Sequence, residues 1–214
     1  MRARRLAALI LILCASAIAG CGGTTLLGTN SSSSSSSTGA QSSASAGGTA
    51  TTSTTAPAPA PAGTVKSADG QFATVIPDGF VNALGSVQAS IKIQYLAAAP
   101  SHDGFSTNIN VVAEPSGAQP SIDTIADSEI AGVKRAEPQA HNFSQLQSLT
   151  VDGQSARAID YLSLPDKRRL LHQYQVFVAK SGTIYTITYS ALPSDYDGNL
   201  AAVKQVTDGW HWLS

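Results

Sequence analysis

The feature that most constrains this chain is the uneven placement of its charged and aromatic residues. All 13 aromatic residues lie at Phe72 or later, and every charged residue except three arginines within the first five positions lies at Lys66 or later. A packed core needs large apolar side chains, so a core can form only in the second part of the chain. That part has about 150 residues, an ordinary size for one domain. The sequence therefore predicts one folded domain over residues 64–214, behind a long uncharged segment.

The first 20 residues have the layout of a secretory signal peptide. Three arginines precede a compact apolar run over residues 6–13, and small residues follow up to Gly20. The apolar run is too short to span a bilayer, because a spanning helix needs about 20 such residues. We therefore expect residues 1–20 to direct export and not to form part of the folded protein.

The tetrapeptide Ile18-Ala19-Gly20-Cys21 at the end of this segment resembles the bacterial lipobox. In proteins with that motif, a thioether joins diacylglycerol to the cysteine sulfur and a peptidase cuts just before the cysteine. The resemblance implies lipid attachment at Cys21 and a protein held at the extracytoplasmic face of the cell membrane by acyl chains rather than by a spanning helix. The alternative is an ordinary secretory peptide with an incidental cysteine.

Residues 21–63 comprise this cysteine and the segment that separates it from the domain. From Gly22 to Gly63, 38 of 42 residues are Ser, Thr, Ala, Gly or Pro, with no charge and no aromatic ring. Such a composition cannot bury enough apolar surface to offset the entropy of ordering. We predict a disordered tether whose Ala-Pro repeat at residues 56–61 stiffens toward polyproline II. An O-glycosylated stalk is the alternative that composition leaves open.

Residues 64–214 combine alternating and helical patterns. Ser121 offers an N-cap to a helix over residues 121–136, and Pro193-Ser194 opens a second helix that runs to about Thr207. Asp152-Gly153 favours a tight hairpin turn, and Trp210 and Trp212 are expected to pack back on the sheet. Period-two alternation predicts strands at residues 71–76, 90–96, 105–114, 147–151, 154–162, 170–179 and 183–191. The predicted fold class is α+β, an antiparallel sheet covered by helices.

The order of these segments resembles a known group of proteins. A Pro-Asp-Gly-Phe turn at residues 77–80 precedes Ser-Thr-Asn-Ile-Asn-Val-Val at 106–112, a helix opened by Ser121, Val-Asp-Gly-Gln-Ser-Ala at 151–156, and Tyr-Thr-Ile-Thr-Tyr-Ser-Ala at 185–191. This pattern resembles the LpqN-type lipoproteins of actinobacteria and, more distantly, the PsbP-like α/β/α sandwich domains, over nearly all of residues 64–214. The resemblance implies an accessory or binding protein rather than an enzyme. It implies no catalytic residues, and the matching pair Asn108 and Asn110 need not form a binding site.

The histidines show no spacing typical of a metal site or a catalytic centre. Four are present, at His102, His141, His172 and His211, and no Gly-x-Ser-x-Gly elbow or phosphate-binding glycine loop accompanies them in the domain. We therefore expect no catalytic residues, no metal and no cofactor. A hydrolase site at His102, beside Asp103 in an expected loop, or at His172, beside Tyr174 in an expected strand, remains an alternative.

Charged residues in the domain are sparse and mostly explained by helix physics. Asp195 and Asp197 fall at the start of the second helix, where anions complement the helix dipole. Asp123 and Asp127 lie one helical turn apart with Glu129 nearby, which indicates either a solvated face or a patch for a divalent cation, and we favour the solvated face. Residues 167–169, Lys-Arg-Arg, form the longest basic run and could either solubilise a loop or touch anionic polymers.

Charge also excludes one class of partner. Without the three leader arginines, 10 basic residues face 14 acidic ones, so the domain has no basic footprint for nucleic acid. We predict a non-enzymatic lipoprotein of the cell envelope whose domain binds a ligand or partner there, either a protein, a polymer or a lipid. The alternatives are a carrier of a lipid or other apolar ligand, with a cavity between sheet and helices, and a hydrolase.

Overall fold

A computed structural model describes residues 60–87, 91–116, 120–165 and 169–213. The predicted signal peptide, the lipid site at Cys21 and residues 21–59 of the predicted tether lie outside the described residues, as do Lys167 and Arg168 of the basic run. The predictions made for them stay predictions. No helix among the described residues is long and apolar enough to cross a membrane.

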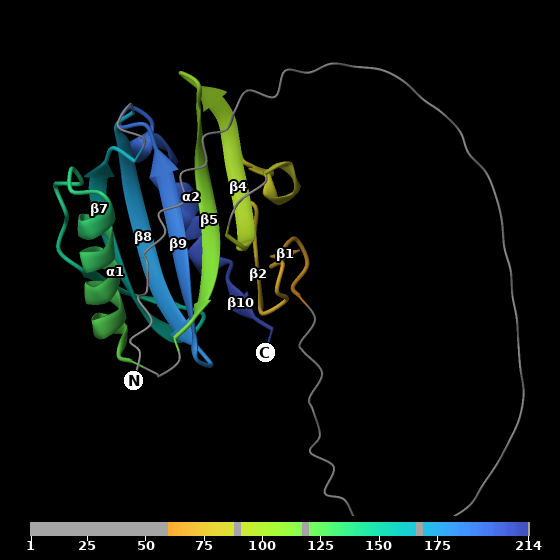
Figure 1. The fold of residues 1–214 in the computed structure, drawn as a ribbon. Coiled ribbons are helices and arrows are strands. Elements are labelled where there is room, and N and C mark those ends of the chain that lie inside the picture. Colours follow the sequence, from red (N-terminus) through yellow and green to blue (C-terminus); the bar gives the residue numbers. More distant parts are fainter. Residues whose placement is uncertain (1–59, 88–90, 117–119, 166–168, 214) are drawn as a thin grey trace, which may run out of the picture. The chain divides into compact units, whose positions relative to one another are not determined.

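The centre of the domain is an antiparallel sheet that has seven strands within the described residues (Figure 1). Its alternating apolar positions follow the period of two that extended chain requires. In spatial order the strands are β3 (Val81–Asn82), β4 (Ile93–His102), β5 (Phe105–Pro115), β9 (Thr183–Ala191), β8 (Leu171–Lys180), β7 (Gln154–Ser163) and β6 (Gln147–Val151).

A second, smaller sheet joins the two ends of the folded domain. It consists of β1 (Val65–Lys66), β2 (Phe72–Thr74) and β10 (His211–Trp212), and β2 lies in the middle. Trp210 stacks on Phe72 with 3.8 Å between ring centroids, and Trp212 lies edge-on to the same ring at 6.4 Å. The prediction that both tryptophans pack back on the core is confirmed.

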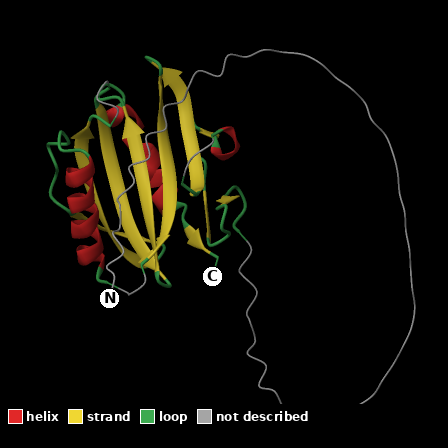
Figure 2. Ribbon diagram, in the orientation of Figure 1, coloured by secondary structure: helices red, strands yellow, loops and turns green. Residues whose placement is uncertain are grey.

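Two helices cover opposite faces of the large sheet (Figure 2). Helix α1 (Ile122–Ala136) packs Ile125, Ala126 and Val133 on one face, and α2 (Tyr196–Asp208) packs Ala202, Val203 and Val206 on the other. A short 3₁₀ helix, η1 (Leu84–Ser86), follows β3. The predicted α+β architecture is therefore confirmed as helices on both sides of an antiparallel sheet.

The hairpin turns follow the expected chemistry. Asp152 and Gly153 have φ values of 41° and 78°, and Asp103 and Gly104 have φ values of 49° and 70°. Two residues with positive φ match the twist of the strands that they join, and the pair Asp-Gly adopts this conformation readily. The first turn was predicted from sequence, whereas the second was assigned to a loop.

The largest error in the predicted strands concerns residues 90–96. The observed strand β4 runs from Ile93 to His102, and its register to β5 shifts between Ile93 and Tyr95. Alternation over residues 90–96 predicts that Ile93 and Tyr95 share one face and that Gln94 points to the other. The register shift breaks this alternation at Gln94, which is buried. Pairing with β5 also extends β4 beyond Leu96 through three alanines, which shows tertiary pairing overriding a weak local preference for strand.

Candidate functional site

The strongest candidate site is a hollow between α2 and the outer strands of the sheet, which we call the α2 groove. Its volume is about 600 Å³, within the range of ordinary ligand sites. Helix α2 contacts β9 of the large sheet. Beside the helix, the groove is lined by residues of β8, β7 and β6, which follow β9 in the sheet. The groove is lined by the apolar side chains of Leu149, Val176, Leu200 and Val203 and by the polar side chains of Asp160, His172, Tyr174, Tyr196, Asp197, Lys204 and Asp208, among others.

Strand periodicity explains which side chains the sheet contributes. Asp160 on β7 pairs with Tyr174 on β8, and His172 lies two residues before Tyr174 on the same face. This is the face on which Ala156 and Val176 join the α2 core, so the three polar residues extend that core toward the edge of the sheet. Leu149 on β6 pairs with Ala156 and lies beside them.

The first residue of α2 closes one end of the groove. The Tyr196 ring stacks on His172, with 3.4 Å between centroids and 13° between planes. Tyr196 is only 4% exposed, and its hydroxyl has no hydrogen-bond partner. By contrast, the Tyr189 hydroxyl donates to the Tyr196 carbonyl at 2.8 Å. A buried hydroxyl without a partner is unusual, because its desolvation is not offset by a hydrogen bond.

The groove also holds a carboxylate with little compensation. The Asp160 Oδ1 atom lies 3.8 Å from His172 Nε2, and the two side chains are 29% and 25% exposed. Burial raises the pKa of Tyr196 and, less strongly, that of Tyr174, and in each case Asp160 is the first charge that adds to the effect. Both phenols are therefore neutral at physiological pH.

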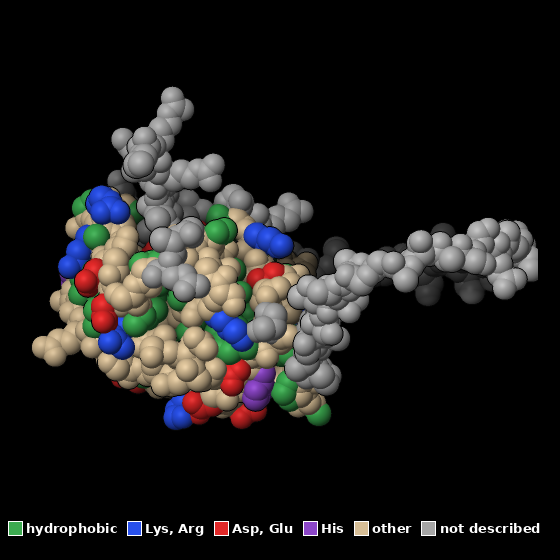
Figure 3. Space-filling model, turned by 90° about the horizontal axis from the view of Figure 1, so that it is seen from below, with side chains coloured by type: hydrophobic (Ala, Val, Ile, Leu, Met, Phe, Trp, Pro, Cys, Tyr) green, Lys and Arg blue, Asp and Glu red, His purple; other side chains and the backbone are tan. Residues whose placement is uncertain are grey.

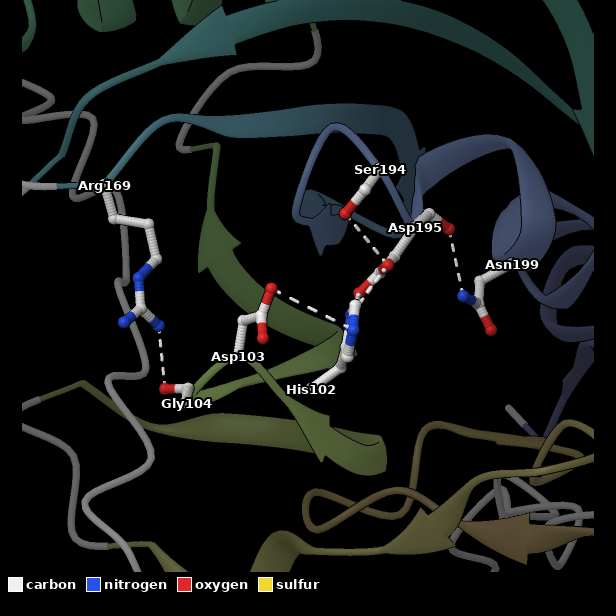
Figure 4. Close-up of polar contacts among 7 residues, drawn as sticks. All are labelled: His102, Asp103, Gly104, Arg169, Ser194, Asp195 and Asn199. Carbon is white, nitrogen blue, oxygen red and sulfur yellow. Dashed lines mark hydrogen bonds and ion pairs between the residues drawn. The ribbon is translucent and has the colours of Figure 1, made fainter.

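A second polar cluster joins the β4–β5 hairpin to the start of α2 (Figure 4). His102 Nδ1 lies 2.9 Å from Asp195 Oδ2 and 3.0 Å from Asp195 Oδ1. The hydrogen bond and charge of Asp195 raise the pKa of His102, and the same hydrogen bond lowers the pKa of Asp195. Two expectations are corrected here: His102 ends a strand rather than lying in a loop, and Asp195 makes no capping hydrogen bond because its carboxylate faces His102.

This cluster does not have the arrangement of a nucleophilic site. The Ser194 hydroxyl donates to Asp195 Oδ1 at 3.0 Å, so it is linked to the carboxylate and not to the imidazole. The other imidazole nitrogen, His102 Nε2, lies 3.9 Å from Asp103. A general base must accept the proton of the nucleophile directly, and no described hydroxyl has that relation to His102. The cluster instead ties the hairpin to α2.

The remaining candidates from the sequence are explained by structure. Asp123 is paired with Arg157 at 2.6 Å, and no group of three metal-binding side chains occurs among the described residues, Asp127 and Glu129 included. Arg169, at the end of the basic run, donates to the Gly104 carbonyl at 2.7 Å. The Asn108 side chain donates to the Ser106 carbonyl at 3.0 Å within the central strand β5, so it does not cap a sheet edge.

The described residues that are visible at the lower end of the domain in Figure 1 form no block of one charge. Figure 3 views that end and shows basic and acidic side chains interspersed among apolar and neutral ones. Charge on this face therefore gives no sign of a polyanion-binding surface.

Sequence reasoning named His172 and Tyr174 as strand residues but missed Asp160 and Tyr196. A usable signal was present for Asp160, which interrupts the apolar run of β7 between Ile159 and Tyr161. The helical spacing of Tyr196, Leu200, Val203 and Val206 predicts that Tyr196 lies on the buried stripe of α2, and Tyr196 is buried. Its stacking on His172, however, joins residues 24 positions apart. No pattern along the chain reports such a pair.

Comparison with known proteins identifies the fold. No family model matches the chain, and no curated protein matches its sequence. Solved structures similar to it include LpqN, involved in cell envelope biogenesis of Mycobacterium tuberculosis, with TM-score 0.52 and 14% identity over 71% of this chain and 90% of that one. They also include the cyanobacterial PsbP of Synechocystis sp. PCC 6803, with TM-score 0.50 and 15% identity over 70% of this chain and 91% of that one. The described domain therefore has a PsbP-like fold.

Proposed function

We propose that this protein is a non-enzymatic lipoprotein of the cell envelope, anchored through diacylglycerol on Cys21, whose domain binds a small apolar or amphipathic ligand in the α2 groove. The observation behind the binding role is the groove itself. The groove combines aliphatic and aromatic side chains with polar groups at both ends, Asp160 and His172 near the start of α2 and Lys204 and Asp208 near its end. Small-molecule sites generally combine an apolar wall with a few polar groups in this way.

The envelope setting rests on two independent supports. The sequence Ile18-Ala19-Gly20-Cys21 resembles a lipobox, and one similar structure is a protein involved in envelope biogenesis. Both concern location and process, and neither identifies a ligand. The groove adds the chemical class, because apolar side chains favour a ligand with an apolar part.

The two alternatives have different support. A carrier of a lipid or other apolar ligand agrees with the groove, although this groove is open to solvent along one side rather than enclosed. A hydrolase with a serine nucleophile would need that serine hydrogen-bonded to a histidine, and among the described residues Ser194 is bonded to Asp195 instead.

The binding role is tested by native and denaturing mass spectrometry of the full chain purified from its membrane. We expect an additional mass of a small molecule in the native spectrum that is lost on denaturation. Leu200→Trp, which fills the half-buried groove wall, should abolish it, whereas Val81→Trp at a 65% exposed position on β3 should not. Equal loss or equal retention in both variants would contradict binding in the groove.

Anchoring is tested separately by fractionation. Cys21→Ser should release the protein from the membrane fraction of a detergent-free lysate, because two acyl chains give stable anchoring and none would remain. Retention of the variant at the wild-type level would contradict the lipid anchor and leave the groove assignment intact.

A further inference from the structure

We infer that the α2 groove selects an organic ammonium carried on an apolar stem, with the Asp160 carboxylate as its counter-charge. This inference rests on the proposed binding role, since it names the chemical class of ligand for the same groove. Three features support it: an uncompensated carboxylate, neutral aromatic groups around it, and an aliphatic wall leading away from it.

The groove has an excess of negative charge. Apart from His172 at 3.8 Å, no described cationic side chain lies within 4 Å of the Asp160 carboxylate. Lys204, which also lines the groove, is paired with Asp208, and Asp197 adds another carboxylate. A carboxylate that is 29% exposed in a largely apolar hollow attracts a cation more strongly than one in open water. The same charge disfavours an anionic ligand.

Neutral aromatic side chains surround this carboxylate. Tyr174 lies opposite Asp160 on the neighbouring strand, and Tyr196 stacks on His172 above them. A primary ammonium has three hydrogen-bond donors, which a carboxylate and phenol oxygens can accept, and aromatic faces add cation–π attraction. An ammonium next to Asp160 would therefore find more than one type of favourable contact.

The unpaired hydroxyl of Tyr196 gives an independent sign of a ligand. It is buried and has no hydrogen-bond partner, and Asp160 is the charge with the largest effect on it. Tyr196 itself lines the groove. A donor placed between Asp160 and Tyr196 would supply the missing hydrogen bond.

The aliphatic wall accounts for the stem. Leu149, Val176, Leu200 and Val203 continue from the Asp160 end of the groove along β6, β8 and α2. Each buried methylene of a stem should tighten binding about fourfold. The groove has a volume of about 600 Å³, which accommodates a chain of several carbons with its head group.

The test uses the full chain in nanodiscs of zwitterionic phospholipid and three water-soluble probes of one stem length: hexylammonium, hexanol and hexanoate. Methyl NMR signals of Leu149, Val176 and Leu200 report binding in the groove. The methyl signal of Val133, on the buried side of α1, is the internal reference. We expect hexylammonium to shift the groove methyls with a dissociation constant about tenfold below that of hexanol, and hexanoate to bind most weakly.

Two variants assign the selectivity. Asp160→Asn keeps the shape of the side chain and should weaken hexylammonium binding about tenfold while leaving hexanol unchanged. Asp127→Asn, an equal change of charge on the exposed face of α1, should have no effect. Tyr196→Phe should weaken hexylammonium more than hexanol, and an unchanged Val133 signal shows that each variant is folded.

The possible outcomes separate the two proposals. If all three probes shift the groove methyls equally, or if Asp160→Asn and Asp127→Asn behave alike, ammonium selectivity is wrong and binding in the groove stands. If no probe shifts the groove methyls, both are wrong. N-acetyl-lysine methylamide is titrated alongside, because a lysine side chain presents the same head group. Binding tighter than hexylammonium supports the proposal with a polypeptide as the source of the ammonium, and weaker binding supports it with a free amine.

Discussion

The two helices lie on opposite faces of one sheet, yet their contacts with that sheet differ. Helix α1 seals its face: Ile125 and Val133 are buried against β7 and β8, and the Ser121 side chain accepts a hydrogen bond from the Thr124 amide at 3.2 Å. Helix α2 leaves the groove open along its flank, and the residue at its N-cap, Asp195, uses its side chain to bind His102 instead of capping.

This difference separates stability from recognition. At α1, the Ser121 side chain caps the helix, and Ile125 and Val133 pack into the core beneath it. At the start of α2, by contrast, one carboxylate is engaged with a distant hairpin and one buried hydroxyl, on Tyr196, is unpaired. Local rules of sequence and structure are expected to fail mainly where function imposes another requirement. The flank of α2 is one place where this domain departs from them, and the end of α1, where both carboxylate oxygens of the C-cap residue Glu137 are buried, is another.

The largest effect on stability should come from the core between α1 and the sheet. Ile125→Ala removes a side chain that is 3% exposed and should lower the free energy of unfolding by about 2–5 kcal/mol. Leu200→Ala in the half-open groove should cost about 1 kcal/mol or less, because less apolar surface is lost. Urea denaturation of both variants measures the contrast. Equal losses would mean that α2 is packed as tightly as α1.

A smaller effect should come from the N-cap of α1. Ser121→Ala removes an N-cap hydrogen bond and should cost about 1 kcal/mol. Ser128→Ala at an exposed position within the same helix serves as control and should be neutral or slightly stabilising, because alanine is the better helix former. Thermal unfolding followed by circular dichroism measures both. A loss on Ser128→Ala equal to that on Ser121→Ala would contradict the capping role.

One substitution should have opposite signs at two neighbouring rings. Tyr196→Phe removes an unpaired buried hydroxyl and should raise the free energy of unfolding by about 1 kcal/mol. Tyr189→Phe removes a hydroxyl that donates to the Tyr196 carbonyl and should lower it by about 1 kcal/mol. Denaturant titration of the two variants gives the signs, and destabilisation by Tyr196→Phe would show that its hydroxyl has a partner in solution.

The smallest effect should be the pH dependence of the stability that the ion pair between His102 and Asp195 contributes. The pKa of His102 is raised, so its contribution is complete below about pH 6.5 and is lost as pH rises through the folded value. The pKa of Asp195 is lowered, so its contribution is present above about pH 4 and is lost at lower pH. Wild type should therefore exceed Asp195→Asn in Tm most between these limits, and by little because the pair is at the surface. A difference independent of pH would contradict the ion pair.

Much of the fold was predictable because its signals are local. The helix capped by Ser121, the hairpin at Asp152-Gly153 and the strand over 183–191 each depend on residues next to one another in the chain, and all three occur as predicted. The strand β4 was predicted poorly, because its extension beyond Leu96 depends on pairing with β5 and its irregularity at Gln94 depends on the register of that pairing.

The sequence by itself determined the class of fold, since composition and periodicity report which residues can be buried. Tertiary structure alone decided the candidate site. The α2 groove joins Leu149, Asp160, His172 and Tyr196, which lie on four different elements. Whether a carboxylate faces a ring or water depends on how those elements pack, and packing is a property of three-dimensional neighbours that the order of residues does not display.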